Sequence, residues 1–74
     1  RSVENISVLR EAIDGKKRVL LQSYRSSNSQ TITDREIEPF HFLPDYEAVW
    51  GFDPEKKQNK QFKISRMGTV PLPY

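Results

Sequence analysis

This chain of 74 residues has no cysteine, a single histidine and three glycines. Without cysteine, disulfide bonds, thiolate metal sites and thiol nucleophiles are all excluded. No apolar run approaches the roughly 20 residues of a membrane-spanning helix, and no secretory leader is recognisable. These two absences predict a cytoplasmic location and no membrane partner. The first residue is Arg1 rather than methionine, which indicates a piece of a longer protein.

The signals of catalysis are missing as well. His41 is the only histidine, no serine stands in a pattern with a base and an orienting acid, and the isolated glycines form no phosphate loop. Asp34, Glu36 and Glu38 alternate, which is more typical of a solvated strand face than of paired catalytic carboxylates. No ligand spacing matches a metal site. We therefore expect no enzymatic activity, no metal and no cofactor.

The charge is small in total but unevenly spread. A net charge of +2 does not by itself imply a partner. Between residues 54 and 67, however, one acid, Glu55, stands against five cations: Lys56, Lys57, Lys60, Lys63 and Arg66. A basic segment of this kind attracts nucleic acid or a phosphate ligand. For the three lysines at positions 56, 57 and 60 we favour the simpler interpretation, that they solvate a turn.

The apolar pattern changes along the chain from helical to strand-like. From residue 3 to residue 14 apolar side chains recur with the helical period, with Ser2 as a plausible N-cap and Gly15 as the stop. Pro39 lacks an N–H and should lie on an edge or at a bulge. Strand-like segments, separated by turn-forming clusters, are predicted at 18–25, 31–43, 46–52 and 60–67, with a short fifth edge strand at 69–74.

One amphipathic helix followed by these strands predicts a mainly β fold with one N-terminal helix, in a single domain that comprises residues 1–74. A chain of this length buries only about 60 % of the surface that its unfolded form exposes, so the core is thin. We expect a small SH3-like or Sm-like β-barrel of four to five strands, closed at one end by the helix. A helix packed on an open antiparallel sheet is the alternative.

Two arginines interrupt the apolar rows of these strands. Alternation along a strand places Arg66 on the face of Phe62 and Ile64. A second row, from residue 33 to residue 41, contains Arg35 and ends at His41. Either each guanidinium faces an internal carboxylate, or both face an anion outside the protein, for which arginine offers planar paired donors.

Three other side chains fit a nucleotide-like ligand. Tyr24 and Trp50 offer flat surfaces on which a base could stack, and His41 could supply a switchable donor. For Trp50 we favour the interpretation as a core residue. These side chains make the sequence more typical of a binding module than of an enzyme.

Several short motifs, in their order and spacing, resemble the WYL domain of bacterial transcriptional regulators. They are Ala-Ile-x-x-x-Lys at 12–17, Ser-Tyr-Arg-Ser at 23–26, Asp-Arg-x-Ile-x-Pro at 34–39 and, after an aromatic strand, Gln-Phe-Lys-Ile-Ser-Arg-Met at 61–67. The likeness covers residues 6–70. Where the family often has Trp-Tyr-Leu, this chain has Tyr46-Glu47-Ala48, so no role of that tripeptide is carried over.

The resemblance implies an Sm-like barrel that senses a ligand, attached to an upstream winged helix-turn-helix domain that binds duplex DNA. It also implies a nucleotide or single-stranded nucleic acid as effector. The binding positions that it implies are Tyr24, Arg35 and Arg66 by motif match and, as their neighbours, Arg25, His41 and Lys63. We therefore expect an effector-binding domain of a transcription factor. The alternative is an interaction module that forms a homodimer, with the arginines paired across the interface.

Overall fold

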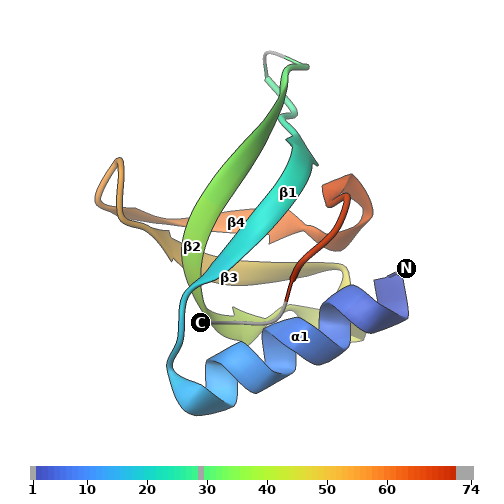
Figure 1. Cartoon of the computed structure of the whole chain (residues 1–74), viewed down its shortest axis with the longest axis vertical. Coiled ribbons are helices and arrows are strands. Elements are labelled where there is room, and N and C mark those ends of the chain that lie inside the picture. The colour runs from blue at the N-terminus through green and yellow to red at the C-terminus, as the bar shows by residue number, and fades with distance from the viewer. Residues whose placement is uncertain (1, 29, 72–74) are drawn as a thin grey trace.

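The computed structural model describes residues 2–28 and 30–71, which form one helix and one antiparallel sheet (Figure 1). The elements are the helix α1 (Ser2–Gly15) and the strands β1 (Val19–Arg25), β2 (Ile32–Phe42), β3 (Ala48–Asp53) and β4 (Gln58–Lys63). Short 3-10 helices, Pro44–Tyr46 and Ile64–Arg66, precede β3 and follow β4. The predicted class, mainly β with an N-terminal helix, is confirmed. No helix in the described part is long and apolar enough to cross a membrane.

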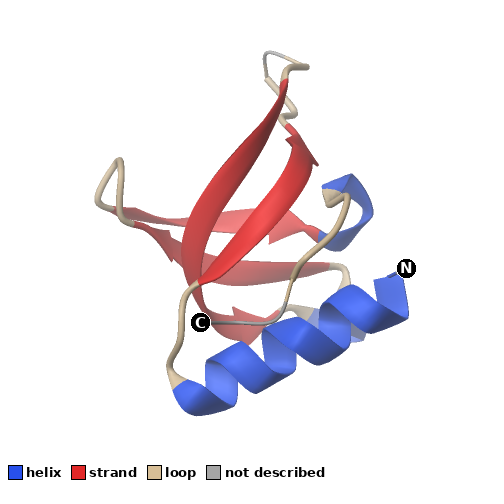
Figure 2. Ribbon diagram, viewed as in Figure 1, coloured by secondary structure: helices blue, strands red, loops and turns tan. Residues whose placement is uncertain are grey.

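The sheet is open. Neighbouring strands pair in the order β1-β2-β3-β4, so within the described ranges β1 and β4 are the outer strands and no ladder joins them. Figure 2 shows the β1–β2 hairpin running across the β3–β4 hairpin, with α1 beside the sheet. The structure thus has the open-sheet arrangement that we kept as the alternative. The predicted fifth strand is reduced to one bridge between Gln22 and Thr69, and residues 72–74 of that prediction lie outside the described residues.

The core lies between the inner face of the sheet and one side of α1. The helical period brings Leu9 and Ala12 to that side, where both are fully buried. The strands supply most of the remaining large buried side chains: Val19, Leu21, Ile37, Val49 and Phe62. One helix therefore covers the apolar face that the strands cannot cover themselves.

Buried Asn5 ties α1 to the segment that follows β4. Its Nδ2 donates to the carbonyl of Gly68 at 3.4 Å, and its Oδ1 accepts from the N–H of Val70 at 3.1 Å. A buried side-chain amide needs such partners, because a buried donor or acceptor without a hydrogen bond lowers the free energy of unfolding by about 1–3 kcal/mol. The two ends of the described chain are therefore joined across the core.

Two bulges decide which side chains point inward. In β1 the register shifts between Leu21 and Tyr24, so both are buried, and Ser23 between them has a positive φ of 57°. In β2 the register shifts between Pro39 and His41, which confirms a bulge at this proline. The extra residue turns His41 to the outer face. The prediction that His41 shares the row of Arg35 was therefore wrong.

Two strand boundaries also differ from the prediction. The chain leaves β4 at Lys63 and forms a 3-10 turn in which the N–H of Met67 donates to the carbonyl of Ile64. Arg66 therefore does not continue a strand row behind Phe62, as we had predicted. The third strand begins at Ala48 rather than at residue 46, because the two residues at 45 and 46 have φ of 59° and 54° and make a turn.

Gly68 lies where no side chain fits, and its replacement should destabilise the fold. A Cβ at this position would stand 2.7 Å from the carbonyl oxygen of Gln22 and 2.8 Å from Cβ of Ser23. Since both atoms belong to the bulged part of β1, the backbone must shift. We expect Gly68→Ala to lower the free energy of unfolding by about 1–3 kcal/mol in chemical denaturation.

Gly15→Ala is the matched control. A Cβ at Gly15 would meet only the side chain of Lys17, at 3.5 Å or more, and alanine is the better helix former. We expect this variant to be as stable as the wild type or more stable. Equal losses in the two variants would contradict the close approach of the two segments at Gly68.

Candidate anion-binding site

A hollow of about 480 Å³ opens between the end of β1, the β1–β2 hairpin and the free edge of β4. This volume is within the range of small-molecule sites, about 300–1,000 Å³. We call it the cationic hollow, after Arg35, Lys56 and Lys60, which line it together with Tyr24 and Gln61; Trp50 lies at its margin. Segments that are far apart in the sequence line one hollow here because β1 and β4 do not pair.

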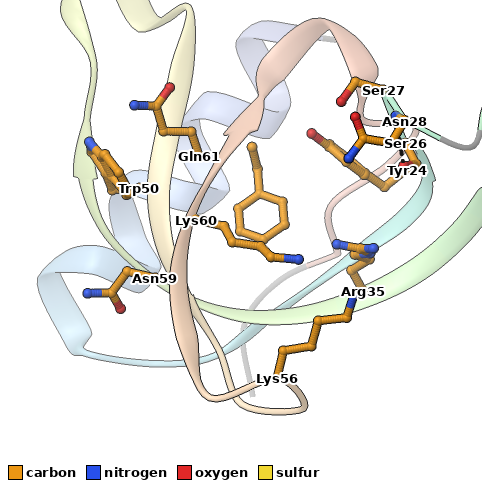
Figure 3. Close-up of a pocket in the computed structure, with 11 residues that line it drawn as sticks. Tyr24, Ser26, Ser27, Asn28, Arg35, Trp50, Lys56, Asn59, Lys60 and Gln61 are labelled. Carbon is orange, nitrogen blue, oxygen red and sulfur yellow. Dashed lines mark hydrogen bonds between the residues drawn. The ribbon is translucent and has the colours of Figure 1, made fainter.

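Three cations converge in the hollow. Figure 3 shows the side chains of Arg35 and Lys60 pointing toward one another, with Lys56 extending from the β3–β4 hairpin to the same place. Burial lowers the pKa of Lys60, and the positive charges of Lys56 and Arg35 lower it further. Burial first, and then repulsion between the cations, therefore disfavours the charged form of Lys60.

The carboxylate of Asp53 lies beside these three charges and pairs with one of them. Asp53 is buried, and its Oδ1 accepts hydrogen bonds from the N–H groups of Glu55 and Lys56 at 2.9 and 3.2 Å. Its Oδ2 lies 3.8 Å from Nζ of Lys60. The attraction opposes the lowering of the pKa of Lys60 but does not cancel it. Asp53 thus shapes the hairpin and balances one of the cations.

Arg35 has no ion pair with any residue that the structure describes. The carboxylates near it in sequence have other partners. Asp34 accepts the N–H of Ser23 at 3.0 Å, while Glu38 and Glu36 face Arg18 at 2.8 and 3.7 Å. The interpretation of Arg35 as one half of an internal ion pair is therefore not supported, and its guanidinium is left facing the hollow.

Tyr24 and the edge of β4 add uncharged donors. The ring of Tyr24 packs edge-on against Phe62, and its hydroxyl oxygen accepts the N–H of Lys63 at 3.1 Å. That N–H points away from β3, and backbone groups along a strand alternate, so the N–H of Gln61 points the same way. The Tyr24 hydroxyl proton and the Gln61 amide can thus both be donated to a ligand.

The other predicted site residues lie elsewhere. Half-buried Arg66 and exposed Arg25 line a second hollow beside Ser23, whereas His41 lies on the outer face of the sheet. Lys63 is exposed and contributes only its backbone to the contact with Tyr24. The structure brings Tyr24 and Arg35 together but not the two arginines that we expected to act as a pair.

Lys56 and Lys60 are the cations of the hollow that sequence analysis missed, because it assigned the lysines at 56, 57 and 60 to a solvated turn. A signal was present for Lys60, since it precedes Phe62 by two residues and must share its inward face. No such signal marks Lys56, whose position depends on the hairpin. In the described part of the chain no three His, Asp or Glu side chains are grouped to hold a metal.

Comparison with known proteins finds similarity to a solved structure. No protein-family model matches this chain, and no curated protein is similar to it. Among solved structures it resembles part of proteasome accessory factor B/C (PafBC) of Arthrobacter aurescens, with a TM-score of 0.81 and 21% sequence identity. The match covers 92% of this chain but 11% of PafBC. At this identity the likeness shows a common fold, which occurs in PafBC as a small part of a larger protein.

Proposed function

We propose that this chain is a ligand-sensing regulatory domain that binds an anionic nucleotide or a single-stranded nucleic acid. The observation that carries the proposal is the convergence of Arg35, Lys56 and Lys60 on one hollow, where the one ion pair that the described residues show for these cations is that of Lys60 with Asp53. Like charges held together in a partly buried place repel one another until an anion arrives. A phosphate group, with several acceptor oxygens, is the chemistry that such donors fit.

The open sheet supports the same interpretation. In a closed barrel the first and last strands would pair, whereas here the space between β1 and β4 is the hollow itself. Assembly through the β4 edge is the rival function. Lysines at 56, 60 and 63 line or flank that edge, and charged side chains of this kind oppose strand pairing between copies. The edge is therefore better suited to a ligand than to a second sheet.

The regulatory part of the proposal is supported by the motifs and the fold. The motifs resemble the WYL domain of bacterial transcriptional regulators, and the fold is one that PafBC contains as about a tenth of its length. In such a regulator the ligand would act by binding one arrangement of the whole protein better than another, which biases a DNA-binding domain elsewhere in it. The proposal assigns this chain a binding role and no catalytic one.

The first test measures the binding of a short labelled oligothymidylate by fluorescence anisotropy at several salt concentrations. Because each neutralised phosphate on a single strand contributes about −0.7 to the slope of log K against log salt, three cations predict a slope of about −2. Arg35→Gln and Lys56→Gln should each weaken binding about tenfold and make the slope shallower by about 0.7.

Lys57→Gln is the matched control, since it removes the same charge from the same hairpin at a residue that does not line the hollow. It should leave the slope and the affinity nearly unchanged. If Lys57→Gln weakens binding as much as Lys56→Gln, only the overall charge attracts the oligonucleotide. Binding that does not depend on salt would contradict the proposal.

The pKa of Lys60 provides a second test, by NMR titration of its side chain with and without inorganic pyrophosphate. The pKa is lowered in the unliganded protein by burial and by Lys56 and Arg35. An anion favours the charged form, so we expect the pKa to rise on binding. The affinity for pyrophosphate should therefore be greatest at a pH below the lowered pKa of Lys60 and should be lost as the pH rises through the pKa of the complex. An unchanged pKa under saturating pyrophosphate would place the anion elsewhere.

A further inference from the structure

An aromatic patch lies on the outer face of the sheet, opposite the core. Phe40, His41 and Trp50, together with Asn59, line an open hollow there. Phe40 is 48% exposed, His41 is exposed and Trp50 is half-buried. We call these four residues the aromatic platform. Large aromatic side chains on a solvated sheet face have no role in the core and need another explanation.

The bulge in β2 creates this platform. Because Phe40 is the extra residue, His41 comes to lie directly opposite Trp50, which in turn lies opposite Gln61. Side chains of directly opposite residues share one face of a sheet. His41, Trp50 and Gln61 therefore form a polar and aromatic row across β2, β3 and β4, and β4 is an outer strand of the described sheet.

The platform is continuous with the cationic hollow. Trp50 and Asn59 line both places. Figure 3 shows these two side chains on one side of the β4 ribbon, with Lys60 and Arg35 on the other. A ligand with phosphate at the cations and a second flat group joined to it could thus contact both sides of one strand. A lone phosphate would leave the platform unused.

We propose that the platform stacks the bases of the strand whose phosphate lies in the cationic hollow, so that the ligand is an oligonucleotide that passes over β4. This inference rests on the proposed function, because it gives a position on the platform to the bases of a ligand whose phosphate the proposed function places in the cationic hollow. A positive groove beside aromatic side chains is the arrangement that holds single strands with little sequence preference. The amides of Asn59 and Gln61 add hydrogen-bonding groups for base edges.

Trp50 is the only tryptophan of the chain, so tryptophan fluorescence reports on this one residue of the platform. Oligothymidylate and an abasic oligomer with the same number of phosphates are each titrated into the wild-type chain. We expect oligothymidylate to quench Trp50 and to bind about tenfold more tightly than the abasic oligomer, since stacking on one aromatic side chain has this magnitude. The abasic oligomer should bind through the cations with little quenching.

Variants separate stacking from charge. Trp50→Leu should bind both oligomers equally, at the affinity of the wild type for the abasic one. His41→Ala changes an exposed residue, so it should fold like the wild type and reduce the difference in affinity between the two oligomers. Tyr46→Leu is the control, because Tyr46 is 43% exposed and lines neither hollow. It should keep the full preference for oligothymidylate.

The outcomes for the two proposals differ. If the wild type binds both oligomers equally and Trp50 fluorescence does not change, the platform is overturned while the anion site stands. If neither oligomer binds, the proposed function fails and the platform fails with it. A preference that persists in Trp50→Leu and His41→Ala would also overturn the inference, since the bases would then contact another surface.

Discussion

The buried carboxylate of Asp53 is the interaction on which the cationic hollow depends. One of its oxygens accepts the first two free N–H groups of the β3–β4 turn, at Glu55 and Lys56, and the other faces Lys60. The hairpin geometry that results directs both lysines toward Arg35, which comes from β2 on the other side of the hollow. A single acid thus positions two cations and compensates for only one of them.

The repulsion between the three cations lowers the stability of the fold, and nothing in the fold itself requires it. Natural sequences tend to break local rules where function demands it, and three converging cations with one acid are such a place. Arg18, by contrast, pairs with Glu36 and Glu38. Arg18, which directly precedes β1, thus has carboxylate partners, whereas Arg35 in β2 has no ion pair among the described residues. This contrast distinguishes a structural ion pair from a site prepared for an anion.

The sequence predicted the elements better than their ends. Helical periodicity and the two hairpin loops were sufficient for α1 and for the order of the strands, and the missing N–H of Pro39 predicted its bulge. The pattern could not show that the bulge would turn His41 outward, nor that β4 would end at Lys63 and leave Arg66 in a turn. Both depend on contacts between distant segments, such as the bond from the N–H of Ile64 to the carbonyl of Glu47.

The site was predicted in part for the same reason. Arg35 was identified because it interrupts an apolar row, and Tyr24 because its ring offers a stacking surface and matches a motif. The two residues do lie together in the cationic hollow. Lys56 was missed because only the turn built around Asp53 shows where its side chain goes. Trp50 and His41 were identified as candidate ligand residues, but their grouping with Phe40 and Asn59 on the outer face was missed. Strand alternation changes at a bulge whose side-chain consequences the sequence does not specify.

The most direct test of the central claim is the stability of Arg35→Met, measured by urea denaturation at low ionic strength without ligand. Methionine keeps the apolar contacts of the half-buried arginine stem and removes its charge. If the three cations repel one another in preparation for an anion, the variant should be as stable as the wild type or more stable. A loss of about 2 kcal/mol or more would contradict the claim, because Arg35 would then be a structural residue with an attractive role in the fold.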